Sequence, residues 1–180
     1  MNPMEDFFIT IATAEDIRGM MTVRHDTWIA TYPNVEHGIT KEDLEGKLKE
    51  MHTGEEARWK ERIANDPSCR AWVAKDNGYV VAFASVQKME EENKIWSLYV
   101  LPRYHGKGIG HRLMTTALAW LGNDKPITVS VAAYNTNAIG FYVSFGFTPR
   151  GKADDPTGIL PSGKTIPEIR MVKQQTNSGG

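Results

Sequence analysis

The sequence predicts an α/β (α+β) domain with a central mixed, mostly antiparallel sheet of about seven strands and helices on both sides. Apolar residues recur with a period of two in some segments and with helical spacing in others, and the two kinds of segment alternate along the chain. An Asn-Gly pair in the middle of the chain is typical of a tight hairpin. The 180 residues are 41% hydrophobic and 24% charged, which is ordinary for a globular protein.

The first third of the chain is predicted to be a strand followed by helices. Residues 8–12 read as a short strand, and Thr13 with Asp16 forms an approximate capping box at the start of a helix. Ile17, Met20, Met21, Arg24 and Trp28 then follow at helical spacing. That helix is expected to end before Pro33. The other elements predicted here are a loop over residues 33–38, a helix beginning at residue 40 and a helix over 55–64.

The remaining two thirds are predicted to supply six strands and two helices. Asn77-Gly78 tolerates the positive φ angles of a hairpin turn, which places strands over 71–74 and 79–84. The further expected elements are strands over 94–100, 127–132 and 166–172, a strand that opens at Phe147, and helices over 108–121 and 138–145. We expect a loop over residues 151–164, a single domain over residues 1–173 and a polar tail over 174–180.

Charge and composition exclude several classes of protein. The net charge is −1, from 21 basic and 22 acidic residues, whereas a nucleic-acid-binding protein usually has a basic excess. No apolar run approaches the roughly 20 residues of a membrane-spanning helix, and the first residues do not read as a secretory signal, so a cytoplasmic protein is expected. Cys69 is the only cysteine, which rules out an intramolecular disulfide and a multi-cysteine zinc site, and no metal is expected.

The segment from Leu101 to Gly110 carries the clearest chemical signal. Gly106, Gly108 and Gly110 lie within five residues, directly before a predicted helix. Glycines let the backbone approach a ligand closely, and the free N–H groups of a helix N-terminus favour an anion such as a pyrophosphate. The alternative is that this glycine-rich segment only connects a strand to a helix and binds no ligand. The loop lacks both the Gly-Lys-Ser/Thr of a Walker motif and the Gly-x-Gly-x-x-Gly spacing of a dinucleotide fold.

A second motif follows about 25 residues later. It comprises Asn135, Ala138, the pair Phe141-Tyr142 and the pair Gly146-Phe147. Together with the glycine loop it resembles the GNAT superfamily of acetyl-CoA-dependent N-acetyltransferases, over roughly residues 7–173. The phosphate loop of that family reads Gln/Arg-x-x-Gly-x-Gly/Ala, and His105 departs from its first position. Because backbone N–H groups make most of the phosphate contacts in that family, we expect the loop to function.

The resemblance implies a role for each matching residue. In that family the pantetheine arm lies between two splayed strands, which here would use backbone groups of Leu98 and Val100. The residues implied in binding acetyl-CoA are Leu98, Tyr99, Val100, His105, Gly106, Lys107, Gly108, Ile109, Gly110, Asn135, Ala138 and Phe141. Tyr142 would protonate the departing thiolate, its alternative role being a core aromatic residue.

The motifs specify fewer residues for binding the acetyl acceptor. Trp28 and Tyr32 are the expected substrate-binding residues, with Glu36 and His37 as further candidates in the following loop and Glu168 on the opposite side. The strand over 94–100 contains no carboxylate, and the Glu residues at 90–92 read as a solvated turn, so no general base is assigned.

The predicted activity is direct transfer of an acetyl group from acetyl-CoA to a primary amine of a small molecule, polyamine-like or otherwise. Three alternatives stay open: a peptide or protein amine as acceptor, a CoA-binding regulator with little turnover, and a phosphate-binding protein of another kind. Relatives in that family are commonly dimers, so a homodimer is one expectation.

Overall fold

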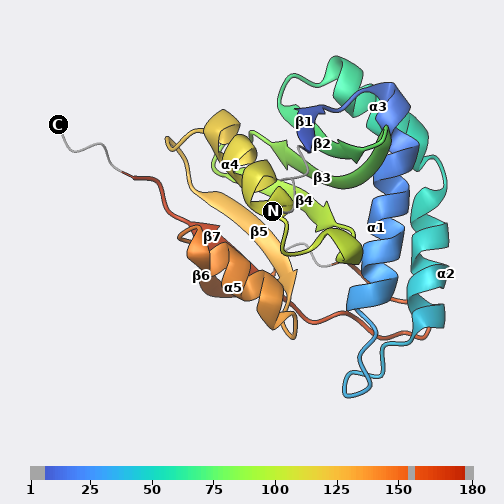
Figure 1. Cartoon of the computed structure of the whole chain (residues 1–180). Coiled ribbons are helices and arrows are strands. Elements are labelled where there is room, and N and C mark those ends of the chain that lie inside the picture. The colour runs from blue at the N-terminus through green and yellow to red at the C-terminus, as the bar shows by residue number, and fades with distance from the viewer. Residues whose placement is uncertain (1–6, 154–156, 177–180) are drawn as a thin grey trace, which may run out of the picture.

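The structure is a computed structural model that describes residues 7–153 and 157–176. Its centre is one seven-stranded mixed sheet in the order β1-β2-β3-β4-β5-β7-β6, which confirms the predicted fold class (Figure 1). The strands are β1 (Phe8–Ile11), β2 (Cys69–Asp76), β3 (Tyr79–Gln87), β4 (Asn93–Val100), β5 (Ile127–Ala132), β6 (Thr148–Lys152) and β7 (Glu168–Lys173). The α-helices are α1 (Ile17–Thr31), α2 (Lys41–His52), α3 (Glu55–Asn65), α4 (Ile109–Leu121) and α5 (Thr136–Ser144).

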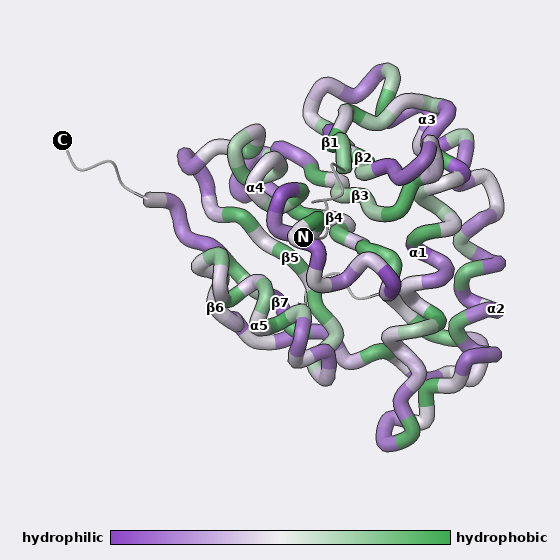
Figure 2. Tube along the Cα trace, viewed as in Figure 1, coloured by the Kyte–Doolittle hydropathy of each residue, from purple (hydrophilic) through white to green (hydrophobic). Residues whose placement is uncertain are grey.

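Helices cover both faces of the sheet. Helices α1 and α4 both contact β3 and β4, and they do so from opposite sides (Figure 1). The approach of α1 is close because Gly19 faces Val80, whose Cγ2 would lie only 2.8 Å from a Cβ at that glycine. Hydrophobic residues line the strands and the helix faces that meet them, whereas the outer sides of α2 and α3 are hydrophilic (Figure 2). No helix of the described chain is long and apolar enough to cross a membrane.

The seam between β4 and β5 is the feature that positions the site. These two strands are parallel, whereas every other neighbouring pair is antiparallel. They are in register over three residue pairs, from Asn93 with Ile127 to Ile95 with Val129. At Trp96, directly after the last pair, a β-bulge interrupts the pairing of β4 with β3. Beyond this point β4 and β5 separate.

An ion pair between α1 and α3 is buried beneath the helical layer. The Arg24 guanidinium binds both carboxylate oxygens of Glu55, one of them at 2.7 Å, and the two side chains are only 8% and 7% exposed. Trp59 also donates its indole N–H to this carboxylate, at 3.3 Å. Helical spacing correctly placed Arg24 on the buried side of its helix, in line with Met20 and Trp28.

Candidate functional site

A cavity of about 760 Å³ opens where β4 and β5 part. Its walls come from both strands, from the C-terminal half of α1, from the glycine loop and from α5. All the residues predicted to contact acetyl-CoA line it except Lys107, whose Nζ lies 5.8 Å and 5.4 Å from the ring centres of Phe7 and Tyr104. Tyr32 and Tyr142 line it as well.

The backbone of β4 presents hydrogen-bonding groups to this cavity. The N–H of Leu101 donates to Val81 on β3 at 3.0 Å, and the direction of backbone groups alternates along a strand. Leu98 and Val100 therefore direct their N–H and C=O groups away from β3, toward the gap left by β5. The Val100 carbonyl accepts a hydrogen bond from Nε2 of His105 at 2.8 Å, so His105 ties the glycine loop to the end of the strand.

The glycine loop leads into the N-terminus of α4. Gly106 and Gly108 have φ angles of +76° and +78°, a region that side chains disfavour, and a Cβ at either position would meet no atom within 4 Å. The first intrahelical bond of the loop runs from Arg112 N–H to Gly108, which leaves the N–H groups of residues 109–111 without helical acceptors. These open glycines and free N–H groups together form a cradle that fits a pyrophosphate.

Helix α5 closes the cavity from the other side. Asn135 caps this helix, and its Oδ1 accepts the Ala138 N–H at 3.1 Å. Phe141 contacts the start of α4, with its Cε2 placed 3.7 Å from where a Cβ of Gly110 would lie. The cap thus uses the Asn135 oxygen, while its side-chain NH₂ group remains the donor for a ligand.

Tyr142 lies at the base of the cavity. Its ring packs edge-on against Phe147 at 5.6 Å, and the side chain is 6% exposed. Its hydroxyl makes no hydrogen bond to any residue that the structure describes. Burial, and secondarily the neighbouring Tyr99, raises the pKa of Tyr142 well above its usual value, so the phenol is a proton donor throughout the neutral range.

A second cavity, of about 380 Å³, lies on the α1–α3 face of the sheet, across β4 from the first. We call it the acceptor cavity. It shares Tyr32, Trp96, Ser97, Tyr99 and Ser130 with the first cavity, so the two meet where the strands part. Trp28 lines it and donates its indole N–H to the Tyr99 hydroxyl at 3.0 Å. The two predicted substrate-binding residues, Trp28 and Tyr32, therefore lie together, with their rings 5.3 Å apart.

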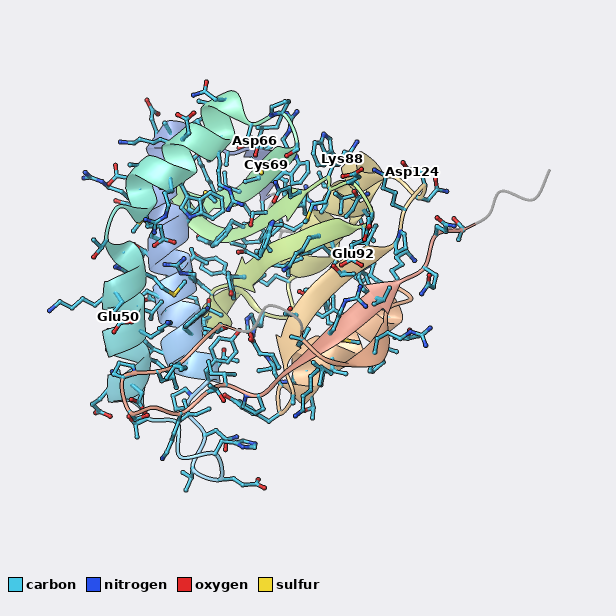
Figure 3. All side chains as sticks on the ribbon, turned by 180° about the vertical axis from the view of Figure 1, so that it is seen from behind. Glu50, Asp66, Cys69, Lys88, Glu92 and Asp124 are labelled. Carbon is cyan, nitrogen blue, oxygen red and sulfur yellow. The ribbon has the colours of Figure 1, made fainter. Side chains whose placement is uncertain are left out.

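Glu168 is the carboxylate that faces these aromatic hydroxyls from β7. It lines the acceptor cavity and is held by the N–H and hydroxyl of Thr157, at 2.6 Å and 2.9 Å. Burial raises the pKa of Tyr32 most, followed by Tyr99, Tyr142 and then the charge of Glu168. Burial and then the charge of Glu168 raise the pKa of Tyr134 to about 12. Glu92 is placed differently, since it binds Arg170 and Thr128 at the joined end of the seam (Figure 3).

The loop after α1 reaches the segment that precedes α5. The His37 ring stacks on Tyr134 with centroids 5.2 Å apart, and the Tyr134 hydroxyl donates to the Tyr32 carbonyl at 2.8 Å. Glu36 is exposed and lines neither cavity. The sequence also contains an acidic pair, Asp154-Asp155, whose charge would attract a cationic amine, and this pair lies outside the described residues.

Sequence reasoning missed Thr27 and Tyr134. Thr27 lines the first cavity from α1, and its buried hydroxyl has no hydrogen-bond partner within the described chain. Nothing in the spacing distinguishes this threonine from other helical residues. Tyr134 directly precedes Asn135, and its closeness to that motif was the one available signal.

Comparison with known proteins agrees with this geometry. The model of the acetyltransferase (GNAT) family matches residues 26–147. Among solved structures, the chain is similar to the PaiA N-acetyltransferase from Thermoplasma acidophilum in complex with coenzyme A, with 18% identity over 94% of this chain and 99% of that one and a TM-score of 0.76. It is also similar to the ribosomal-protein-S18-alanine N-acetyltransferase from Escherichia coli, with 17% identity over 96% of both chains and a TM-score of 0.62.

The family match covers well over half of the chain, and both motifs quoted above fall inside it. The chain therefore belongs to the GNAT acetyltransferase family.

Proposed function

We propose that this protein transfers the acetyl group of acetyl-CoA directly to a primary amine of a small molecule. The observation that carries the proposal is the meeting of two cavities at the seam between β4 and β5. One cavity has a cradle for pyrophosphate and a strand edge for an amide-containing arm. The other has aromatic walls and the Glu168 carboxylate, which suit an amine. The remaining charged residues of its lining are the paired Arg24 and Glu55, with Arg58, Arg62 and Lys94.

The first cavity would hold the acyl donor. The N–H groups at the start of α4 would bind its pyrophosphate, and the strand edge at Leu98, with the N–H of Val100, would pair with its amides. Acetyl-CoA supplies an activated acetyl group as a thioester. A backbone N–H of the free edge would polarise the thioester carbonyl, and Tyr142 would donate a proton to the departing sulfur.

The second cavity would hold the amine. A primary amine is almost entirely protonated near neutral pH, because its pKa is about 10.4. The Glu168 carboxylate would bind the ammonium group, take up its proton and leave the nitrogen free to attack. Because Thr157 fixes both carboxylate oxygens, this side chain is held in one orientation.

Glu168→Gln tests this assignment. We expect kcat/KM for the acceptor to fall about tenfold at neutral pH, the modest size reflecting proton transfer through water. The rate of the variant should also rise with pH until about pH 10, since only the free amine then reacts. Steady-state pH profiles of the wild type and the variant measure this. Parallel profiles would remove the proton-accepting role from Glu168.

A thiol-release assay tests the activity itself. The panel contains simple primary amines, polyamines, amino acids, aminoglycosides and short peptides, with a reaction lacking acceptor as control. We expect acceptor-dependent release of CoA with a small amine, and thermal stabilisation of the protein by acetyl-CoA but not by ADP. Release of CoA with peptides alone would show that the acceptor is a peptide or protein amine and not a small molecule. Binding with no release would favour the regulatory alternative, and equal stabilisation by ADP would indicate a different phosphate-binding protein.

A further inference from the structure

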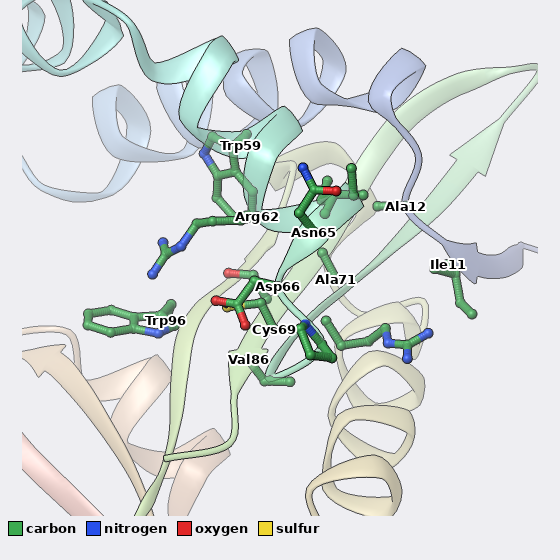
Figure 4. A pocket seen from close by; sticks show the side chains of 15 residues that line it. Ile11, Ala12, Trp59, Arg62, Asn65, Asp66, Cys69, Ala71, Val86 and Trp96 are labelled. Atoms are coloured by element: carbon green, nitrogen blue, oxygen red, sulfur yellow. The ribbon is translucent and has the colours of Figure 1, made fainter. Parts of the chain in front are cut away.

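A third cavity, of about 330 Å³, lies beside the acceptor cavity on the same face of the sheet (Figure 4). It extends from the C-terminal half of α3 across the start of β2 and the end of β3. It shares Trp59, Arg62 and Trp96 with the acceptor cavity, and Trp96 alone with the first cavity, which would hold the acyl donor. The third cavity is therefore an extension of the acceptor cavity and not of the first cavity.

A row of small residues connects the two neighbouring cavities. Ser97 on β4 pairs with Ser85 on β3, and Ser85 pairs with Ala71 on β2, so all three side chains point to the same face of the sheet. Ser97 lines the acceptor cavity, whereas Ser85 and Ala71 line the third. Neighbouring strands are about 4.8 Å apart, so the row runs about 10 Å from Ser97 to Ala71.

The third cavity has an apolar lining and one buried hydroxyl without a partner. The side chains of Trp59 and Ile63 on α3 line it with apolar surface. Ser85 is 4% exposed, and its Oγ makes no hydrogen bond to any described residue. Such a group is costly to bury unless a ligand satisfies it. The cavity therefore offers apolar contact and one hydrogen bond.

The polar groups at its rim limit the class of occupant. Asp66 accepts hydrogen bonds from Ser68 and from Sγ of Cys69, the latter at 3.2 Å, and Figure 3 shows Asp66 and Cys69 side by side. Arg62 places its guanidinium 5.8 Å from the centre of the Trp96 ring. Arg62 lines both cavities, and in the acceptor cavity Glu168 supplies the opposite charge for an amine. In the third cavity the carboxylate of the lining, Asp66, already accepts from Ser68 and Cys69, so a neutral aromatic group that packs against the indoles fits better than a second ammonium group.

We propose that the third cavity is a subsite for the tail of the acceptor, which is an amine bearing a neutral aromatic group on a short linker. The proposal rests on the proposed function and names its substrate class. The reacting nitrogen lies near Ser97 and Glu168, and the aromatic ring lies over Ser85, between Trp59 and Trp96. A polar substituent on the ring bonds the Ser85 hydroxyl.

Acceptors of different length test the subsite. We expect kcat/KM to be about 10- to 100-fold higher for 2-phenylethylamine than for ethylamine, since the ring adds buried apolar area. Ala71→Leu fills the far end of the row and should abolish most of that preference while preserving the rate with ethylamine. Ala57→Leu, at an exposed position of α3, is the matched control and should preserve the preference. Equal rates for the two amines in the wild type would overturn the proposal.

Ser85→Ala tests the hydrogen bond. For the wild type we expect kcat/KM to be higher for 4-hydroxyphenylethylamine than for 2-phenylethylamine, and for the variant we expect the two to be equal. The difference persisting in the variant would remove Ser85 from the subsite.

A binding measurement separates failure of the subsite from failure of the proposed function. Because Trp59 and Trp96 line the cavity, 2-phenylethylamine should change the tryptophan fluorescence in the presence of CoA. Ala71→Leu should remove this change, and Ala57→Leu should retain it. If no amine is acetylated but this pattern holds, the subsite stands and the activity is wrong. If amines are acetylated and Ala71→Leu leaves the titration unaltered, the subsite is wrong.

Discussion

Replacing Tyr142 with phenylalanine is expected to lower kcat about 100-fold, the lower end of the range for loss of a general acid. The change removes only the hydroxyl, which has no hydrogen-bond partner within the described chain, and retains the ring that packs on Phe147. The KM for acetyl-CoA should therefore change little. Steady-state kinetics with a saturating acceptor would measure both constants.

The pH dependence of the wild type gives a second check on Tyr142. A general acid must be protonated, so its contribution is lost as the pH rises through its pKa. Burial raises that pKa well above its usual value, so no falling limb from this group should appear below about pH 10. Tyr79→Phe, which removes the hydroxyl of an exposed tyrosine that lines neither cavity, serves as the control. An unchanged kcat in Tyr142→Phe would leave Tyr142 as a core aromatic residue.

Arg24→Met is expected to lower the free energy of unfolding by about 3–5 kcal/mol. The substitution leaves the Glu55 carboxylate buried without its cation, and both side chains are at most 8% exposed. Because small domains are stable by only about 5–15 kcal/mol, the loss is a large share of the total. Chemical denaturation followed by circular dichroism would measure it.

Two further variants separate the buried pair from an ordinary ion pair. Arg18 binds Glu56 at 3.2 Å with 84% of its side chain exposed, so Arg18→Ala should change the stability little. The double variant Arg24→Met/Glu55→Leu removes both charges and should be more stable than Arg24→Met alone. If Arg24→Met and Arg18→Ala lost equal stability, the buried pair would have no special role.

The order of elements was predictable because it depends on local signals. The Asn77-Gly78 turn, the helical spacing after Thr13 and the glycine loop each fix the conformation of neighbouring residues. Boundaries were less accurate where tertiary contacts decide them. The last strand begins at Glu168 rather than at residue 166, and β6 extends to Lys152, inside the predicted loop.

The site was predictable only where a motif carries it. The loop residues from His105 to Gly110 and the α5 residues from Asn135 to Tyr142 each lie in one short segment, so a linear pattern could identify them. The partner of Arg24 is 31 positions away, and spacing along the chain does not identify such a pair. The third cavity depends on the register of three strands, which brings Ala71, Ser85 and Ser97 into one row.

Only three residue pairs join β4 to β5 in the described structure, so this seam is a weak connection between two parts of the sheet. Strands β1–β4 form one hydrogen-bonded block and β5–β7 form another, and few backbone bonds cross between them. An acyl donor that paired with β4 while contacting α5 would hold the two blocks together. Amide hydrogens on β5 and β7 should then exchange more slowly in the liganded protein, so the concentration of such a ligand would determine how cooperatively the sheet opens.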